Sequence, residues 1–266
     1  MIQKVSVVLA THNEELNLEQ CLAAVKDFAD EVIVVDGEST DTTVALAKKL
    51  GARVISTTNK ANFHINKQMA MDEAKNDLVL QLDADEVIDQ ELIQFIQELR
   101  DTDSVTARQH ASEVAWWIRR RNYFLGTFLK KGGQYPDPSI RLYRRGKARL
   151  PQKDVHELMV ADGPVGWAEG HMLHYPTPHF SDYMRKFQTY TSFKAQQLFE
   201  KQEKISLTTG VNYLLIKPTV TFMSLFVRHK GFVDGIPGFV FALMSGLHHT
   251  ISYLKLWELH QRQRQP

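Results

Sequence analysis

The chain has 266 residues, of which 43% are apolar and 24% charged, and its formal net charge at neutral pH is +1. This composition is ordinary for a folded protein, gives no reason to expect nucleic acid as a partner, and suffices for one large domain with a tail. The single cysteine, Cys21, excludes an internal disulfide and predicts a reducing compartment. Because the first residues lack a long apolar run followed by a cleavage site, we expect them to form a strand and the protein to be cytoplasmic.

Residues 1 to about 100 alternate short β-rich runs with amphipathic helices. Strands are predicted at residues 5–9, 31–35, 52–56 and 77–82, and helices at residues 14–27, 39–50, 65–74 and 89–100. Apolar strands joined by helical crossovers are typical of a parallel sheet that is covered on both faces. In such sheets ligands bind beyond the carboxyl ends of the strands, where polar residues occur here at 11–14, 36–39 and 83–86.

The pattern changes after residue 104. Short β-like runs at 114–118 and 140–143 predict antiparallel strands that are added to the first sheet. A helix is predicted at residues 180–203, capped by Ser181 or Asp182, and two apolar segments follow between residues 211 and 257. We therefore expect one domain over residues 1–178, divided near residue 100, and a helical extension over residues 179–266.

An acidic cluster follows the last strand of the first half. Asp83, Asp85 and Glu86 lie within four positions, and closely spaced carboxylates repel one another and lose solvation, so something should compensate them. If the chain stays extended, Asp83 and Asp85 project from the same side, and two such carboxylates suit Mg²⁺ or Mn²⁺. The alternative is a solvated acidic turn before a helix that starts near Asp89.

A second carboxylate, that of Asp36, ends the second predicted strand. It could accept a hydrogen bond from a nucleobase N–H or a ribose hydroxyl. The alternative is a helix N-cap, but Ser39 or Thr40 could cap that helix and leave Asp36 available.

Three segments now carry a family resemblance. Residues 7–15 (VVLATHNEE), 34–41 (VVDGESTD) and 82–86 (LDADE) resemble the successive motifs of family 2 glycosyltransferases with the GT-A fold. Segments at 141–144, 155–157, 174–175 and 230–239 are similar to the short bacterial transferases that add β-glucose to the lipopolysaccharide inner core, so the resemblance covers nearly the whole chain. One departure is that family members often have two acids in the second motif, whereas Gly37 stands in the second place here.

The resemblance implies a GT-A, Rossmann-like fold with a mostly parallel central sheet, flanking helices and a membrane-associating helical extension. It implies a UDP-sugar donor, UDP-glucose above all, whose uracil Asp36 would hold alone. In the Asp83-Ala84-Asp85 motif, Asp85 would ligate the cation directly, with Asp83 toward the ribose or the metal. The cation would neutralise charge on the departing diphosphate. Other residues expected in the donor site are Ala10, Thr11, Glu14, Asn66 and Lys67.

An inverting transfer also needs a general base that takes a proton from the acceptor hydroxyl. The candidates are Asp154, His156 and Glu157; in an extended segment the first two share one face and Glu157 takes the other. The family's acidic motif falls on His156 and Glu157. We therefore expect Glu157 to be the base, with Asp154 as the alternative and His156 as a phosphate or acceptor contact. A charged surface loop is the remaining interpretation.

Basic residues are in excess between residues 114 and 152, where acids are nearly absent. Such a region suits a phosphorylated acceptor or anionic lipid headgroups, although a solvated surface is the alternative. Arg121, Arg141 and the aromatic Trp116 are the expected acceptor contacts, although core packing is the commoner role of such aromatic residues. No recognised nucleic-acid motif is present.

The tail could associate with a membrane. Residues 236–257 are long enough to span a bilayer, but His248, His249 and Lys255 lie among them. Helices that lie in the membrane interface, with residues 228–230 and Lys255 toward the headgroups, are favoured over a subdomain that packs on the core.

These features predict a metal-dependent, inverting enzyme that moves a hexose from a UDP-sugar to a lipopolysaccharide inner-core or other lipid-linked saccharide. It would work peripherally on the inner face of the cytoplasmic membrane. One alternative keeps the fold and changes the acceptor to a polyprenyl phosphate, a capsule intermediate or a protein. Another is a non-catalytic membrane adaptor that binds nucleotide sugars. No oligomeric state is predicted.

Overall fold

The computed structural model describes residues 1–152, 158–177 and 179–264. The chain divides into two compact units, one formed by Met1–Arg120 with Asp137–His174 and the other by Arg121–Pro136 with Tyr175–Pro266. Residues 121–136, which were expected in the domain of residues 1–178, belong to the helical unit. The boundary expected near residue 178 stays a prediction.

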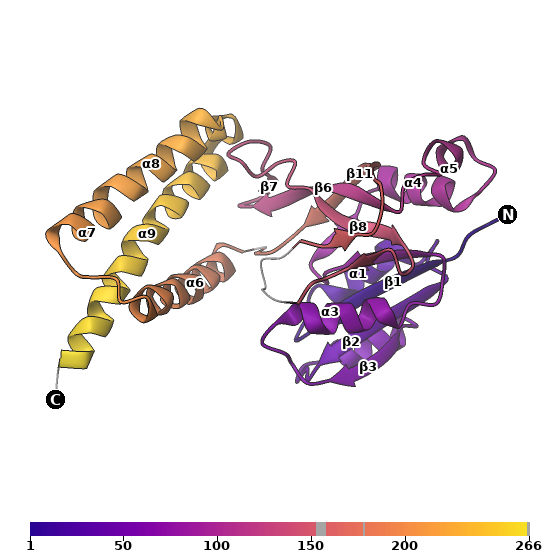
Figure 1. The fold of residues 1–266 in the computed structure, drawn as a ribbon, viewed down its shortest axis with the longest axis horizontal. Helices are drawn as coiled ribbons and strands as arrows, with labels where there is room; N and C mark the ends of the chain where they lie inside the picture. Colours follow the sequence, from indigo (N-terminus) through magenta and orange to yellow (C-terminus); the bar gives the residue numbers. More distant parts are fainter. Residues whose placement is uncertain (153–157, 178, 265–266) are drawn as a thin grey trace. The chain divides into compact units, whose positions relative to one another are not determined.

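The first half of the chain forms four parallel strands in the order β3-β2-β1-β4 (Figure 1). The elements predicted from apolar periodicity are all present, although the first two helices are shorter than predicted and the third begins two residues earlier. The strands are β1 (Val5–Thr11), β2 (Glu31–Gly37), β3 (Arg53–Thr57) and β4 (Leu78–Leu82). The helices are α1 (Leu18–Val25), α2 (Thr43–Lys49), α3 (Phe63–Asp72) and α4 (Gln90–Arg100).

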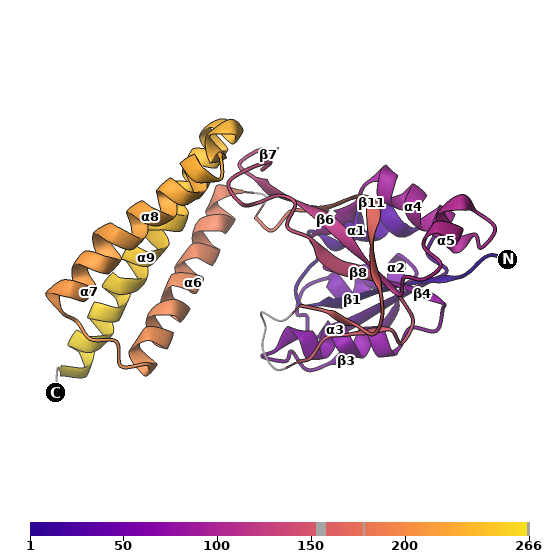
Figure 2. The same cartoon turned by 45° about the horizontal axis from the view of Figure 1, so that its top comes forward.

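Both faces of this parallel half are buried. Along β1, Val7 and Leu9 point into a cluster that includes side chains from α1 and α4, and Val8 points into a cluster that includes side chains from α3. Figure 2 shows α3 on the opposite side of these strands from α1. Because both faces of the sheet are covered, side chains on both sides of each strand are apolar. The strand sequences are therefore continuous apolar runs rather than alternating apolar and polar residues.

The remaining strands extend the same sheet in antiparallel fashion, in the order β4-β8-β6-β11-β5. This confirms the prediction for residues 104–174 and makes the sheet mixed. Because β8 pairs with β4, a residue of β8 can reach the turn that follows β4. The added elements are β5 (Glu86–Ile88), α5 (Val105–Gln109), β6 (Ala115–Phe124), β7 (Thr127–Phe128), β8 (Ser139–Arg144) and β11 (Val165–His174), with a separate pair of β9 (Ala148–Arg149) and β10 (Val160–Ala161).

The helical unit contains three long helical segments. Helix α6 (Phe180–Glu200) has His179 at its N-cap position, and this residue makes no side-chain capping bond. The prediction that Ser181 or Asp182 caps the helix is therefore wrong. Residues 207–228 form one continuous segment, and a 3₁₀ turn then leads into the last helix. These elements are α7 (Leu207–Val211), η1 (Asn212–Ile216), α8 (Lys217–Met223), η2 (Ser224–Arg228), η3 (Gly231–Asp234) and α9 (Gly235–Arg264).

Gly170 is required where β11 crosses the start of α4. Its φ is +81°, and a β-carbon there would lie 2.2 Å from the backbone nitrogen of Leu92. We expect Gly170→Ala to lower the free energy of unfolding by about 3 kcal/mol or more, because it combines left-handed strain with a backbone clash. Urea denaturation followed by circular dichroism measures the change.

Gly51 offers the matched control for this substitution. Its φ is +85°, but a β-carbon there would meet nothing within 4 Å. Gly51→Ala should therefore cost only the conformational strain, about 1 kcal/mol. Equal losses of stability in the two variants would show that the clash at Leu92 is absent in solution.

Candidate active site

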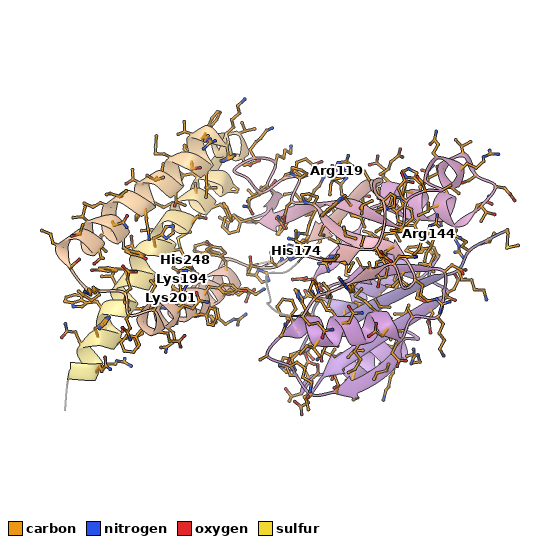
Figure 3. The ribbon with its side chains drawn as sticks, in the orientation of Figure 1. Arg119, Arg144, His174, Lys194, Lys201 and His248 are labelled. Atoms are coloured by element: carbon orange, nitrogen blue, oxygen red, sulfur yellow. The ribbon has the colours of Figure 1, made fainter. Side chains whose placement is uncertain are left out.

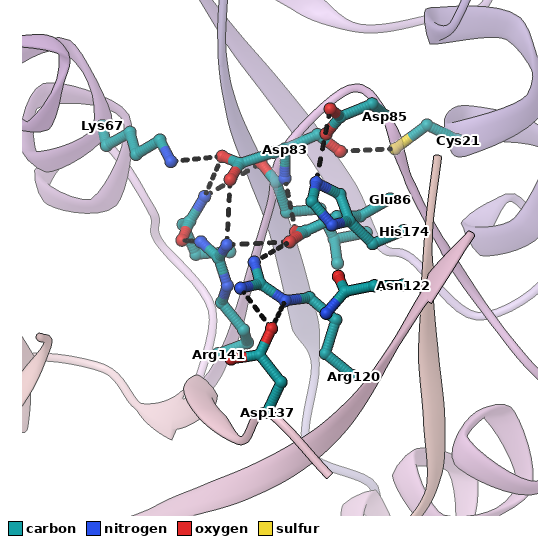
Figure 4. Close-up of polar contacts among 12 residues, drawn as sticks. Cys21, Lys67, Asp83, Asp85, Glu86, Arg120, Asn122, Asp137, Arg141 and His174 are labelled. Carbon is teal, nitrogen blue, oxygen red and sulfur yellow. Dashed lines mark hydrogen bonds and ion pairs between the residues drawn. The ribbon is translucent and has the colours of Figure 1, made fainter. Parts of the chain in front are cut away.

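The acidic cluster lies on a tight turn between β4 and β5. The Glu86 backbone nitrogen donates to the Asp83 carbonyl at 3.0 Å, so the chain turns directly after Leu82. The prediction that Asp83 and Asp85 share one side of an extended chain is therefore wrong. Their carboxylates have different partners: Asp83 contacts Lys67 and Arg141, whereas Asp85 contacts His174 (Figure 4).

Asp83 is compensated by two cations of the protein itself. Its Oδ1 lies 2.5 Å from Lys67 Nζ, and its Oδ2 lies 2.9 Å from Arg141 Nη2. Burial raises the pKa of Asp83, but Arg141 and then Lys67 outweigh this effect and lower the pKa far below its usual range. Asp83 is therefore a carboxylate anion at any physiological pH, and both of its oxygens are held.

Arg141 links this turn to the neighbouring strands. Its Nη2 also lies 2.9 Å from Oε1 of Glu86, a fully buried carboxylate on β5 whose Oε2 accepts from the Asp83 backbone nitrogen at 2.9 Å. Burial lowers the pKa of Arg141, but Asp83 and Glu86 outweigh burial and raise it. Arg120 Nη1 reaches the same Glu86 oxygen at 3.4 Å and pairs with Asp137 at 2.7 Å. Buried charges persist only when they are paired, so this network fixes the turn.

Asp85 faces a histidine instead. Its Oδ2 lies 3.5 Å from Nε2 of His174, and the two side chains are 21% and 18% exposed. His174 is the last residue of β11 and stands opposite Glu86 in the register of β5 and β11. A carboxylate and an imidazole at this spacing suit a divalent cation, so the donor set at Asp85 fits Mg²⁺ or Mn²⁺ better than that at Asp83. His174 was not among the predicted site residues, although the resemblance included residues 174–175.

A second acid–histidine group has a structural explanation. Ligand atoms of Asp89, Glu91 and His171 all lie within 4.8 Å of one another. Asp89 Oδ1, however, accepts from the backbone nitrogens of Leu92 and His171, and Oδ2 contacts His171 Nδ1 at 3.0 Å. Asp89 is thus the N-cap of α4, which confirms that it starts the next helix.

Asp36 is buried at the end of β2, opposite Thr11 of β1. Thr11 Oγ1 donates to its Oδ1 at 3.1 Å, and the backbone nitrogen of Ser39 donates to its Oδ2 at 3.0 Å. The expectation that Ser39 caps α2 and leaves Asp36 available is wrong, because Ser39 binds Asp36 and α2 begins only at Thr43. A carboxylate oxygen can accept more than one hydrogen bond, so a contact with a nucleobase stays a prediction.

Asn66 carries a buried amide beside Gly37. Its Nδ2 donates to the Thr58 carbonyl at 3.1 Å, whereas its Oδ1 has no hydrogen-bond partner among the described residues. An unsatisfied buried acceptor costs about 1–3 kcal/mol unless a ligand or water supplies a donor. A β-carbon at Gly37 would lie 3.0 Å from Asn66 Nδ2, so close packing explains why an acid cannot stand there without displacing Asn66. The other expected donor residues, Ala10 and Glu14, are partly buried.

The three residues predicted to contact the acceptor have different surroundings in the structure. Trp116 is fully buried and its Nε1 donates to His110 Nδ1 at 3.2 Å, so the predicted contact with an acceptor does not fit the structure. Arg141 has the structural role described above, and its acceptor contact, like that of Arg121 on β6, stays a prediction.

Several cations of the basic region are held by contacts within the fold. The guanidinium of Arg144 lies 5.6 Å from the ring of Trp116, and its Nε donates to the Glu113 carbonyl at 2.9 Å. Arg119, which is labelled with Arg144 in Figure 3, lies 5.0 Å from the ring of Trp167. For these two cations the structure favours packing over an open anion-binding surface.

The candidate bases Asp154, His156 and Glu157 lie outside the residues that the structure describes. In sequence they fall between β9 and β10, just before Leu158. Their roles remain predictions that substitution must test.

Comparison with known proteins identifies the family. A family profile described as "Glycosyl transferase family 2" matches residues 6–157, more than half of the chain. The chain belongs to the family 2 glycosyltransferases. Its mixed sheet with a parallel first half is the GT-A-like fold, here with a C-terminal helical extension.

Curated relatives match over nearly the full length. The chain is 29% identical to an uncharacterized glycosyltransferase of Rickettsia typhi, over 99% of this chain and 90% of that protein. It is 28% identical to the lipopolysaccharide core biosynthesis glycosyltransferase LpsC of Rhizobium meliloti, over 96% of this chain and 92% of LpsC.

Solved structures match more distantly. Staphylococcus aureus TarS aligns with a TM-score of 0.46 and 18% identity, over 92% of this chain and 49% of TarS. Glucosyl-3-phosphoglycerate synthase of Mycobacterium tuberculosis, solved with Mn²⁺ and UDP-glucose, aligns with a TM-score of 0.35 and 21% identity, over 46% of this chain and 44% of that chain. The aligned part is thus about half of each solved chain or less.

The network around Arg141 predicts a large loss of stability when its cation is removed. Arg141→Met leaves Asp83 and Glu86 without their shared partner, and we expect the free energy of unfolding at neutral pH to fall by about 3–5 kcal/mol. Because the pKa of Asp83 is lowered in the folded state, its contribution is fully present above its ordinary pKa of about 3.9 and is lost as the pH falls below that value. The variant should therefore lose less stability than the wild type on acidification, as urea titrations at several pH values would show.

Arg53 provides the matched surface control. Its guanidinium pairs with Glu73 at 2.8 Å, but both side chains are substantially exposed, at 39% and 44%. Arg53→Met should cost less than about 1 kcal/mol. If the two substitutions cost the same, the charges around Arg141 are solvated rather than buried.

Proposed function

We propose that this family 2 glycosyltransferase moves a hexose, with inversion, from a UDP-sugar to a lipopolysaccharide inner-core or other lipid-linked saccharide. The observation that carries the proposal is the divided acidic turn, in which Asp83 is neutralised by Lys67 and Arg141 while Asp85 faces His174. The similarity to LpsC over nearly the whole chain supports the class of acceptor. Glucose is the hexose that we propose.

The donor would bind along the carboxyl ends of the parallel strands. Strands β2, β1 and β4 are neighbours, so Thr11, Asp36 and Asp83 come to the same edge of the sheet. Asp36 would accept a hydrogen bond from the uracil. Asn66 Oδ1 would accept a hydrogen bond from a donor group of the nucleotide. Asp83, oriented by Lys67 and Arg141, would face the ribose. Ala10, Thr11 and Glu14 would line the pocket.

Asp85 and His174 would hold the Mg²⁺ or Mn²⁺ ion. When bound, the ion supplies positive charge to the departing diphosphate. Glu86 and Arg141 would act indirectly, because they fix the turn from which Asp85 projects. Glu157 would take the proton of the acceptor hydroxyl, with Asp154 as the alternative base and His156 as an acceptor contact.

The helical unit would keep the enzyme on the inner face of the cytoplasmic membrane. Two of its segments, Leu207–Arg228 and Gly231–Gln263, are long and apolar enough to enter a bilayer. A lipid-linked acceptor lies at such a surface, so peripheral attachment would bring enzyme and acceptor together.

The donor and acceptor are tested by measuring UDP release from a panel of UDP-sugars with deacylated lipopolysaccharide core. We expect acceptor-dependent release with UDP-glucose, and Glu157→Gln should retain UDP-glucose binding while transfer falls by about 100-fold or more, since the general base is lost. Asp154→Asn is the matched comparison, and the opposite result would make Asp154 the base. Binding of UDP-glucose without turnover, with this core or with polyprenyl phosphate, would instead indicate an adaptor.

The proposed metal ligands can be tested by measuring metal binding, which does not require turnover. We expect Asp85→Asn and His174→Gln each to weaken Mn²⁺ binding about 10-fold or more in calorimetric titrations with UDP present, because each removes a ligand. Glu91→Gln, in the other acid–histidine group, is the control and should leave the affinity unchanged. If only Glu91→Gln lost Mn²⁺ binding, the metal site would instead be the group formed by Asp89, Glu91 and His171.

A further inference from the structure

The helical unit exposes a long apolar face. The continuous segment of residues 207–228 contains no acidic residue, and Lys217 is its only base before Arg228. Helix α9 continues this face, with Ile236 76% exposed. An apolar surface of this extent is rare on a soluble protein and marks a binding site for a partner or a membrane. Its most exposed members are Leu207, Leu215, Ile216, Val220, Phe232, Val233 and Ile236.

The other side of α9 is covered by a polar helix. Lys255 Nζ donates to the carbonyl and side chain of Gln188 and to the hydroxyls of Thr191 and Ser192, all at 2.8–2.9 Å. Figures 1 and 2 both show α9 between α6 and α8. The unit therefore has a polar side formed by α6 and an apolar side formed by the 207–228 segment and α9.

Helices α6 and α9 run side by side in the same direction. At their starts, the ring of Phe124 packs on Tyr183 of α6 at 5.0 Å and on Phe241 of α9 at 5.7 Å. At their ends, Phe199 of α6 packs on His260 of α9 at 5.1 Å. Any bilayer that α9 crossed would therefore also be crossed by α6.

Helix α6 cannot cross lipid, because it carries charged residues along its length. Each such side chain at the centre of a bilayer costs roughly 2.5–3.5 kcal/mol or more. Three of them lie in the first two turns and one ends the helix, but Lys194 lies in the interior, close to the polar residues 188–192. The residues are Asp182, Arg185, Lys186, Lys194 and Glu200. Contact with a membrane must consequently place α9 and the 207–228 segment parallel to its plane.

An apolar pocket opens beside α7. It has a volume of about 410 Å³ and is bounded by α7, η1 and the last turns of α9. This size is within the range of small-ligand sites, and the absence of polar atoms from most of the lining suits a hydrocarbon chain. Exposed Lys201 and Lys204 lie just before it in sequence, where they could meet an anionic headgroup. Its lining includes Ile205, Leu207, Gly210, Val211, Tyr253 and Trp257.

We propose that the apolar face of residues 207–228 and α9 lies in the plane of one leaflet of an anionic bilayer, and that the pocket beside α7 holds a lipid acyl chain. The protein is then monotopic: both ends of the 207–228 segment and all of α6 stay on one side of the membrane. The inference deepens the proposed peripheral attachment and does not depend on which donor or acceptor the enzyme uses.

Flotation of the full-length protein with phosphatidylcholine vesicles, with and without phosphatidylglycerol, tests the face. The triple substitution Leu215→Gln, Val220→Gln, Ile236→Gln should lower vesicle affinity at least about tenfold, since each side chain loses apolar burial. The control triple Leu16→Gln, Val105→Gln, Tyr190→Gln changes equally exposed apolar residues elsewhere and should bind as the wild type does. The proposal would be overturned if the first triple variant bound vesicles as tightly as the wild type, or if both triple variants lost the same vesicle affinity. Circular dichroism checks that each variant is folded, and UDP-glucose binding checks its donor site.

The in-plane orientation is tested by cysteine labelling on sealed vesicles. In a Cys21→Ser background, Lys204→Cys and Lys230→Cys place single thiols at opposite ends of the 207–228 segment. A membrane-impermeant maleimide added outside should label both after the protein has bound. Protection of one position until detergent is added would show that the segment spans the bilayer, and would overturn the proposal.

The pocket is tested with the fluorescent fatty acid cis-parinaric acid. Gly210 lines the pocket, and a β-carbon there meets only Tyr253 Oη at 3.6 Å, so Gly210→Leu should fill the cavity without a clash and weaken binding about tenfold. Thr208→Leu, on the same helix but outside the lining, should bind the probe as the wild type does. If the wild type does not bind the probe, or if both variants lose it equally, the pocket is not an acyl-chain site.

Discussion

The buried guanidinium of Arg141 is the interaction on which the site depends. It contacts Gln81 of β4, Asp83 of the turn and Glu86 of β5 from its own place on β8. A charge buried in this way is stable only with its partners in place, so the position of β8 and the shape of the acidic turn stabilise each other. This explains why the antiparallel strands belong to the same sheet as the parallel half: one of them, β8, supplies the cation that holds the acidic turn.

The charge balance around this turn also bears on metal binding. Lys67, Arg120 and Arg141 pair with the carboxylates of Asp83, Glu86 and Asp137, and the further carboxylate of Asp85 brings the formal charge of these seven groups to −1. A divalent cation at Asp85 would change this balance to +1, beside a diphosphate that gains charge as it leaves. Because Lys67 and Arg141 hold both oxygens of Asp83, Asp85 is the carboxylate of this motif that would bind such a cation.

Local patterns in the sequence were enough to predict the strands and helices of the first half, because each apolar run and its turn residues lie within a few positions. They were not enough for the acidic turn, since Asp83 and Arg141 are 58 residues apart and their pairing depends on β8 lying beside β4. Trp116 shows the same limit: alternation along β6 does not say which face is buried. Asp36 and Ser39, however, are only three positions apart in the sequence. The tendency of Asp side chains to bind nearby backbone nitrogens could have indicated this contact.

The tail shows how tertiary packing changes the meaning of hydropathy. By length and composition the 207–228 segment and α9 both qualify as membrane-spanning helices. What argues against a crossing is a different helix, α6, whose charges would have to enter the bilayer together with α9 because the two are packed along their length. Hydropathy measures the cost of inserting one helix, whereas the unit inserts as a whole. The same apolar residues therefore favour a position in the interface, where α6 remains in water and the 207–228 segment meets the acyl chains.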